Sequence, residues 1–275
     1  MTGTSAPPAE QLAAALRSPF VPLVARRLEA AGAYLDVVWP QLAPSVDTAG
    51  FLGSALYMAD MALDAVEDVY EPVLTPDSLT GSAITAAELA ELSEVLDVFH
   101  WVQPQLLLLV AALAEAWEQP SVGGRGRLEP RVTAPREQDH LRTAVSLTPP
   151  STPPLPEIAA ALQLDEAPEL YRAAARWPRY LAAAWEELQH LVAFPLFRQR
   201  GRGLYYYARS SSRFLAQPLH ASETALRERG LSDAELVAAR AAIDAALPTL
   251  ATMMMHCTAM RLGLGINRRE VVAQP

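Results

Sequence analysis

Apolar and polar positions along the chain recur at helical spacing, and neither half shows the sustained alternation of a half-buried strand. Ala and Leu dominate and β-branched runs are few, which favours helix. The fold is therefore predicted to be all-α, with about five helices in each half. We expect the helices near residues 9–17, 20–31, 33–44, 48–72 and 85–117, then 157–164, 169–176, 178–192, 196–216 and 232–263.

Residues 119–156 separate the two groups of helices. They contain 8 of the 23 prolines and three glycines. Proline lacks the backbone N–H that a helix needs, and its ring clashes with the preceding turn. We therefore expect an extended connection that lies over the surface. The predicted organisation is a first helical repeat at 9–118, a proline-rich linker at 119–156 and a second helical repeat at 157–265.

The two halves resemble each other in sequence. Tyr34–Trp39 aligns with Tyr180–Trp185 at an offset of 146 residues. Thr85–Glu88 and Ser232–Glu235 both have the pattern of a capping box, at an offset of 147. The helices that begin there each carry an interior proline, where a kink or break is expected: Pro104 and Pro248. This shared order predicts two tandem helical repeats that form a pseudo-dimer.

Composition and charge narrow the functional classes. The chain of 275 residues is 51% apolar, which is enough for a large core, and its net charge of −9 argues against a nucleic-acid partner. One cysteine, Cys257, cannot form an internal disulfide and fits a reducing cytosol. Met1–Glu10 lacks the basic region of a signal peptide, and the apolar run Leu106–Ala114 is too short to cross a bilayer. We expect a cytoplasmic protein that does not enter the membrane.

Carboxylate and imidazole groups occur three residues apart at Asp97–His100 and at Glu187–His190, so each pair shares a helix face. Di-iron bundles use such pairs with further glutamates. A clear pair of partner glutamates is missing here, so both are interpreted as surface pairs. Two other histidines are expected to be solvated: His140 and His220. His256 lies in an apolar helix and is predicted to be a core histidine with a local hydrogen bond.

Two charged stretches leave alternatives open. Acidic residues share a helix face and could hold magnesium, although paired aspartates are absent and a solvated face is the preferred interpretation: Asp60, Asp64, Glu67 and Asp68. The equivalent stretch of the second half is basic, so the copies differ in charge. Its arginines could attract an organic anion or could be solvated: Arg198, Arg200, Arg202, Arg209 and Arg213.

Six segments in one order carry a resemblance to a known family: Leu16–Phe20, Tyr34–Trp39, Gln103-Pro104, Val122–Gly124, Trp177-Pro178 and His256–Thr258. In this order they resemble the group I (DL-) 2-haloacid dehalogenases, the DehI family, over about residues 10 to 265. The resemblance implies an all-helical pseudo-dimer with its active site between the repeats. It also implies that an aspartate activates water, which displaces halide from a 2-halo acid without an ester intermediate, a metal or an organic cofactor.

Carried over residue by residue, the resemblance assigns four positions. The amide that places the water falls on Gln103, where the family has asparagine, and the aromatic residue of the pocket falls on Phe20. The catalytic aspartate falls on Leu170, which cannot take a proton from water. A shift of one residue brings Glu169 to this place as a substitute base. Two hypotheses follow for a monomer or homodimer: a cofactor-free dehalogenase that acts on a small organic acid, or a small-molecule-binding protein that lacks this catalysis.

Overall fold

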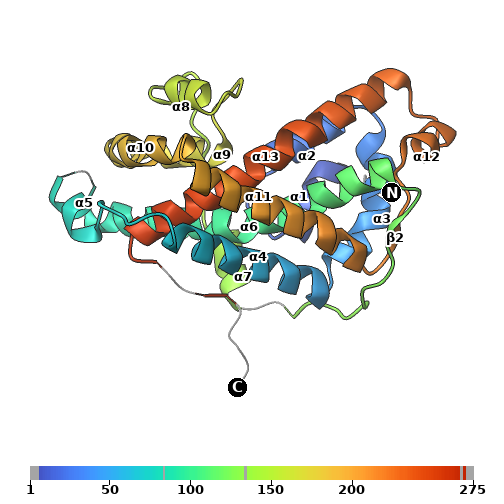
Figure 1. Ribbon diagram of the computed structural model, residues 1–275, viewed down its shortest axis with the longest axis horizontal. Helices are drawn as coiled ribbons and strands as arrows, with labels where there is room; N and C mark the ends of the chain where they lie inside the picture. The colour runs from blue at the N-terminus through green and yellow to red at the C-terminus, as the bar shows by residue number, and fades with distance from the viewer. Residues whose placement is uncertain (1–5, 83, 133–134, 267–268, 271–275) are drawn as a thin grey trace, which may run out of the picture.

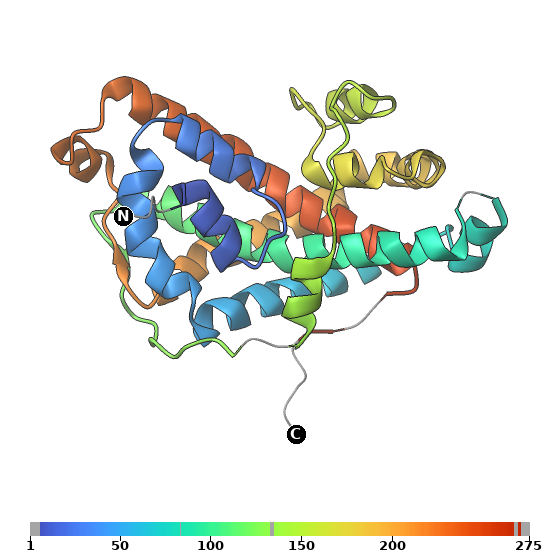
Figure 2. The same ribbon diagram turned by 180° about the vertical axis from the view of Figure 1, so that it is seen from behind.

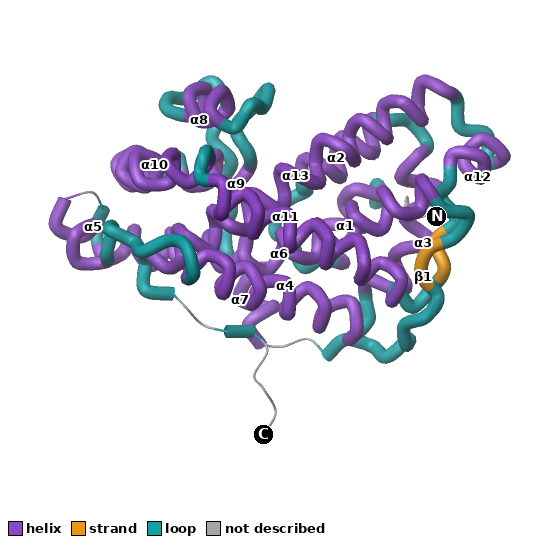
Figure 3. The backbone as a smooth tube through the Cα atoms, in the orientation of Figure 1, coloured by secondary structure: helices purple, strands orange, loops and turns teal. Residues whose placement is uncertain are grey.

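The computed structural model describes residues 6–82, 84–132, 135–266 and 269–270. Within these residues the chain forms helices and two short strands, so the all-α prediction is confirmed (Figure 3). The first part comprises α1 (Pro8–Ala15), α2 (Leu23–Ala30), α3 (Tyr34–Val46), α4 (Ala49–Glu67), α5 (Pro76–Ser82) and α6 (Ala86–Glu118). After it come β1 (Val122–Gly123) and α7 (Pro135–Arg142).

The second part comprises α8 (Leu155–Ala161), α9 (Glu169–Ala174), α10 (Pro178–Val192), α11 (Pro195–Ser211), the 3₁₀ turn η1 (Ser212–Phe214), β2 (Pro218–Leu219), α12 (Glu223–Glu228) and α13 (Asp233–Gly263). Strand β1 of the linker pairs antiparallel with β2. The linker is therefore not wholly extended, because it also contains α7. Residues 1–5 and 133–134, which belong to the predicted N-terminal stretch and linker, lie outside the described residues.

Four helices make the centre of the fold: α4, α6, α11 and α13 each pack against the other three. Helix α13 runs diagonally across α6, with α1, α2 and α3 towards one end and α8, α9 and α10 towards the other (Figures 1 and 2). Both capping boxes are formed, at Thr85 and Ser232, and they begin these two longest helices. The contacts of α6 with α13 and of α4 with α11 fit a tandem repeat, which stays a prediction together with its boundaries.

The break expected near Pro248 is wrong, and of the kink or break expected at Pro104 a break is excluded. Helix α6 runs unbroken over 33 residues and α13 over 31, although each contains its proline. A proline removes one backbone hydrogen bond, whereas the packing of both helices against α4 and α11 in the centre of the fold stabilises the helical conformation around each proline. By length and composition alone either helix could cross a membrane. The most apolar window of α6 is 94% buried inside the protein, as in a core helix, whereas that of α13 is only 39% buried.

Candidate active site

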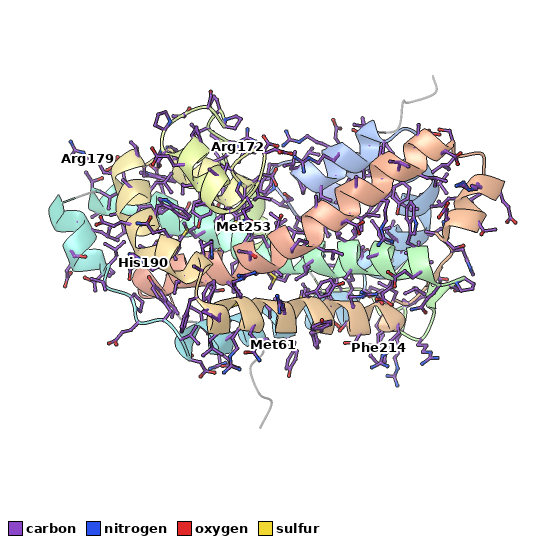
Figure 4. The ribbon with its side chains drawn as sticks, turned by 45° about the horizontal axis from the view of Figure 1, so that its top comes forward. Met61, Arg172, Arg179, His190, Phe214 and Met253 are labelled. Carbon is purple, nitrogen blue, oxygen red and sulfur yellow. The ribbon has the colours of Figure 1, made fainter. Side chains whose placement is uncertain are left out.

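A cleft of about 650 Å³, its open mouth included, lies where α2, α6, α9 and α13 meet. Residues assigned from the sequence lie far apart along the chain, yet all of them line this cleft: Phe20, Gln103, Glu169 and Leu170. We call it the site cleft. Figure 4 labels Met253, a cleft residue on α13, and Arg172, which lies on α9 but does not line the cleft. Its walls are largely apolar, and the side chains on the α13 side are mostly small, which leaves the space open.

Glu169 is the first residue of α9 and follows Pro168. Its Oε1 accepts a hydrogen bond of 2.9 Å from the backbone N–H of Leu23, the first residue of α2, and lies 3.4 Å from the Arg26 guanidinium. Helix α2 has no side-chain cap from its own Pro22, so Glu169 satisfies one of the free amides at its start. The side chain thus joins α9 to α2.

Burial also changes the acidity of Glu169, whose side chain is 15% exposed. Loss of solvation raises its pKa from 4.5 to about 7, although the Leu23 amide and Arg26 both favour the ionised form. A carboxylate with a pKa near neutrality can exchange protons with a bound water at ordinary pH. This is the protonation behaviour that a general base needs.

Gln103 comes from the middle of α6, where it is 5% exposed. Its Oε1 is buried and has no hydrogen-bond partner among the described residues. Gln105, two residues further on, donates to the backbone oxygens of Trp101 and Leu16. Buried amides normally find partners in this way. The free Oε1 of Gln103 is therefore a polar acceptor held at an otherwise apolar wall, where it can take a hydrogen bond from water or from a ligand.

Phe20 and Leu170 give the site cleft much of its apolar character. Phe20 packs on Phe99 with ring centroids 5.3 Å apart, and its position is fixed by a turn in which the Ser18 hydroxyl donates to the Phe20 oxygen. Leu170 is 1% exposed. A leucine at this place offers contact to the apolar part of a ligand and no proton transfer.

Several residues of the site cleft were not predicted from the sequence: Arg27, Phe99, Thr249 and Met253. Arg27 is the one cation among the described residues that line the cleft, and it lies 3.4 Å from Glu166. Phe20, Leu23, Val24 and Arg27 follow the spacing of one helix face. That spacing was visible in the sequence, although only the packing of α2 on α13 shows which face is turned inward.

Three other sequence interpretations are corrected. His100 is not at the surface, because its Nε2 lies 3.1 Å from Glu270 and both side chains are nearly buried. Asp60 is buried too, and it accepts a hydrogen bond from the Glu270 amide. His140 is 4% exposed and packs edge-on against Trp101. In each case a distant segment covers the side chain, which the local sequence does not reveal.

His256 is in the core, as predicted, but its partner is not local. The Tyr171 hydroxyl lies 2.6 Å from His256 Nδ1, although the two residues are 85 positions apart. Among the described residues no group of three or more His, Cys, Asp or Glu side chains is placed to hold a metal ion. Asp64, Glu67 and Asp68 lie near arginines instead, in ion pairs with Arg269 and Arg200.

The fold is that of solved all-helical haloacid dehalogenases. A D-2-haloacid dehalogenase mutant in complex with D-2-CPA matches with a TM-score of 0.82 and 20% identity, over 92% of this chain and 89% of that one. A D-2-haloacid dehalogenase with L-LA matches equally well, with a TM-score of 0.82, 20% identity and the same coverage. At this identity the likeness shows the fold.

The family model described as halocarboxylic acid dehydrogenase DehI matches residues 19–145, a little under half of the chain. The resemblance to the DehI family is thereby confirmed for this part, which contains Phe20 and Gln103. Glu169 and Leu170 lie beyond it. Among curated proteins, no relative matches the chain.

Proposed function

We propose that this protein is a 2-haloacid dehalogenase-type hydrolase that acts on a small organic acid without a cofactor. One observation carries the proposal: the residues expected from the family resemblance come from two separate helices, α6 and α9, and the turn before α2, and they line a single cleft. The polar groups in that cleft suit the chemistry, because Glu169 has a pKa of about 7 and Gln103 has a free Oε1.

In the proposed reaction a water molecule is held between Gln103 and Glu169. The Gln103 Oε1 accepts one hydrogen bond from this water, and ionised Glu169 takes its proton as the water oxygen attacks the α-carbon. The carbon–halogen bond breaks, the halide leaves with the bonding electrons, and the product is a 2-hydroxy acid. The apolar walls, including Phe20 and Leu170, exclude other water, and Arg27 provides positive charge for the substrate carboxylate.

A binding protein without this catalysis is the second candidate. It is favoured by the hydrogen bond that Glu169 accepts from Leu23, because an acid that caps a helix has a structural reason to be there. It is also favoured by Leu170, which stands where the family resemblance calls for the aspartate. On either proposal the ligand is a small organic acid. We further propose a cytoplasmic location, in keeping with the buried free thiol of Cys257, and assembly as a monomer or homodimer.

Halide release from D- and L-2-chloropropionate by the purified chain decides between the two candidates. We compare the natural protein with Glu169→Gln, because the amide can still accept the Leu23 hydrogen bond but cannot take a proton. The expected loss of kcat is about 100-fold or more, as for other general bases. Asp165→Asn is the matched control, since Asp165 is exposed in the same segment and does not line the cleft.

Each result has one meaning. Release that depends on Glu169 and not on Asp165 supports the hydrolase and its base. Release that is unchanged in Glu169→Gln refutes the assignment of the base. No release from either enantiomer, with 2-chloropropionate still binding in the cleft by calorimetry, favours the binding protein.

A further inference from the structure

A second and larger cavity lies on the other side of α13. This groove runs between α11 and α13 and is closed by the ends of α8 and α10. Its volume is about 1560 Å³ with its open mouth. We call it the α11 groove. Helix α13 turns one face to the site cleft, with Ala246 and Leu250, and another to the α11 groove, with Leu247 and Ala251. This double exposure accounts for the low burial of α13.

The arginines of α11 and the following turn divide into two sets. Three have partners: Arg200 pairs with Asp68, Arg209 with Glu115 and Glu118, and Arg213 lies over the Phe214 ring. Arg198 and Arg202 make no side-chain hydrogen bond or ion pair with any described residue, and both line the α11 groove. They are four positions apart, so they lie one above the other on the same helix face. Two unpaired cations at one wall attract an anion.

The rest of the α11 groove is suited to an apolar body. Leu162, Val192, Phe197 and Leu247 line it, and Tyr205 adds an aromatic ring with a hydroxyl. The acid in the lining, Asp244, is already hydrogen-bonded to Arg240 at 2.8 Å. The cations of α11 are therefore not neutralised by a carboxylate across the groove.

His256 lies at the inner end of the α11 groove and packs against Phe197 with ring centroids 5.6 Å apart. It is fully buried, and its Nδ1 is engaged by the Tyr171 hydroxyl at 2.6 Å. Its Nε2 is buried and has no partner among the described residues. Whichever tautomer the ring adopts, the Tyr171 hydroxyl engages Nδ1, and Nε2 stays an unused donor or acceptor. A buried polar group of this kind calls for an explanation, and a polar atom of a ligand is one.

We propose that the α11 groove binds an amphipathic organic anion, a flat apolar body with one carboxylate, sulfonate or phosphate group. Arg198 and Arg202 hold the anionic group at the mouth, and the apolar body lies between α11 and α13. His256 Nε2 meets a polar atom of the ligand at the inner end. This site is separate from the site cleft, and it does not depend on the proposed hydrolysis.

The glycines of α11 offer a matched pair of variants. A Cβ added at Gly201 meets only Met255 Cγ, at 3.8 Å, so a side chain there enters the α11 groove without a clash at its root. A Cβ at Gly203 meets nothing within 4 Å, and Gly203 is exposed and does not line the groove. Gly201→Leu therefore fills the groove, whereas Gly203→Leu makes the same change on the same helix outside it.

The test is a fluorescence titration of the full chain with 1-anilinonaphthalene-8-sulfonate, whose naphthalene and phenyl rings carry one sulfonate. N-phenyl-1-naphthylamine is the uncharged comparison. We expect saturable binding of the sulfonate that Gly201→Leu abolishes and Gly203→Leu leaves intact. The double variant Arg198→Gln/Arg202→Gln should weaken sulfonate binding by about tenfold or more and leave the uncharged probe unaffected, because hydrogen bonds to a charged group are lost.

The variant Ala246→Leu places a larger side chain in the site cleft and so shows whether the probe binds there. Sulfonate binding that survives Ala246→Leu and is lost in Gly201→Leu supports the proposal. Binding lost only in Ala246→Leu puts the probe in the site cleft and overturns it, as does the absence of saturable binding. If Gly201→Leu fails to fold, the exposed arginine double variant decides, and unchanged sulfonate affinity in that variant overturns the proposal.

Discussion

Removal of the Glu169 carboxyl should change how stability depends on pH. Its folded pKa is about 7, whereas the ordinary value is 4.5. Below 4.5 the group is protonated in both the folded and the unfolded chain and carries no penalty. Between the two values the folded chain keeps a proton that the unfolded chain releases, so the free energy of unfolding falls as pH rises. Above about 7 the whole penalty is present.

The size of this effect follows from the pKa shift. Each pKa unit corresponds to about 1.4 kcal/mol, so a rise from 4.5 to about 7 is worth about 3 kcal/mol. Glu169→Gln has no proton to gain or lose there. Relative to the natural protein, the variant should therefore gain about 3 kcal/mol of unfolding free energy between pH 4 and pH 8. A difference in hydrogen-bond strength between the glutamate and the glutamine adds a constant to the difference in unfolding free energy and does not change its dependence on pH.

Urea unfolding of both proteins at pH 4, 5, 6, 7 and 8 measures this difference. Groups that titrate in both chains cancel in this difference. Activity should change in the opposite sense, because hydrolysis needs the ionised form and kcat/KM should rise through pH 7. A stability difference that is flat from pH 4 to 8 would refute the reasoning that burial raises this pKa. An activity already at its plateau at pH 5 would contradict the assignment of Glu169 as the base.

Substitutions at three other residues, Gln103, Tyr171 and Glu235, test separate contacts. Gln103→Leu should lower halide release by about tenfold or more. It should leave the free energy of unfolding equal or up to about 1 kcal/mol higher, because an unpartnered buried amide is removed. Gln103→Asn should keep most of the release, and equal rates in all three proteins would contradict the role of the amide. Tyr171→Phe should cost about 1–3 kcal/mol in urea unfolding, because it leaves the buried His256 with no hydrogen bond, and an unchanged midpoint would disprove this. Glu235, whose pKa the amides of Ala33 and Ser232 lower to about 2, contributes stability that is present above its ordinary value of 4.5 and is lost as pH falls towards 2. Glu235→Gln should therefore be less stable at pH 7 and lose less stability on acidification, which thermal unfolding at pH 7, 4 and 2.5 measures.

The helices with clear periodicity could be predicted from the sequence, and those that depend on context could not. The spacing and capping boxes placed α6 and α13 to within a residue or two. The short helices α5, α7 and α12 lie outside the predicted ranges, since six to eight residues carry too little periodicity to stand out. The breaks expected at Pro104 and Pro248 failed for a related reason: local propensity is a weak guide where tertiary packing surrounds the helix.

Burial of single polar residues was the least predictable property. His100 and Asp60 look like surface residues on their own helices, and both are covered by the segment with Glu270, far along the chain. For the candidate site, the family resemblance assigned residues before α2, on α6 and on α9, and assigned none of the cleft residues on α13. Thr249 and Met253 could not be assigned, because α13 is apolar over much of its length and has two different faces that line cavities.

The position of the acid at 169 rather than 170 has a physical reason in the fold. The start of α2 has an amide at Leu23 and no local cap, and Glu169 is the residue that reaches it. Glu169 accepts the Leu23 hydrogen bond through Oε1, and its Oε2 makes no hydrogen bond to any described residue. A carboxylate can accept through both oxygens, so Oε2 remains available. One side chain can therefore fix the joint between α2 and α9 and still take a proton at the site cleft. On the proposed function, the base would then be part of the contact that positions Arg27 beside it, so we expect changes in the cap to affect binding and catalysis together.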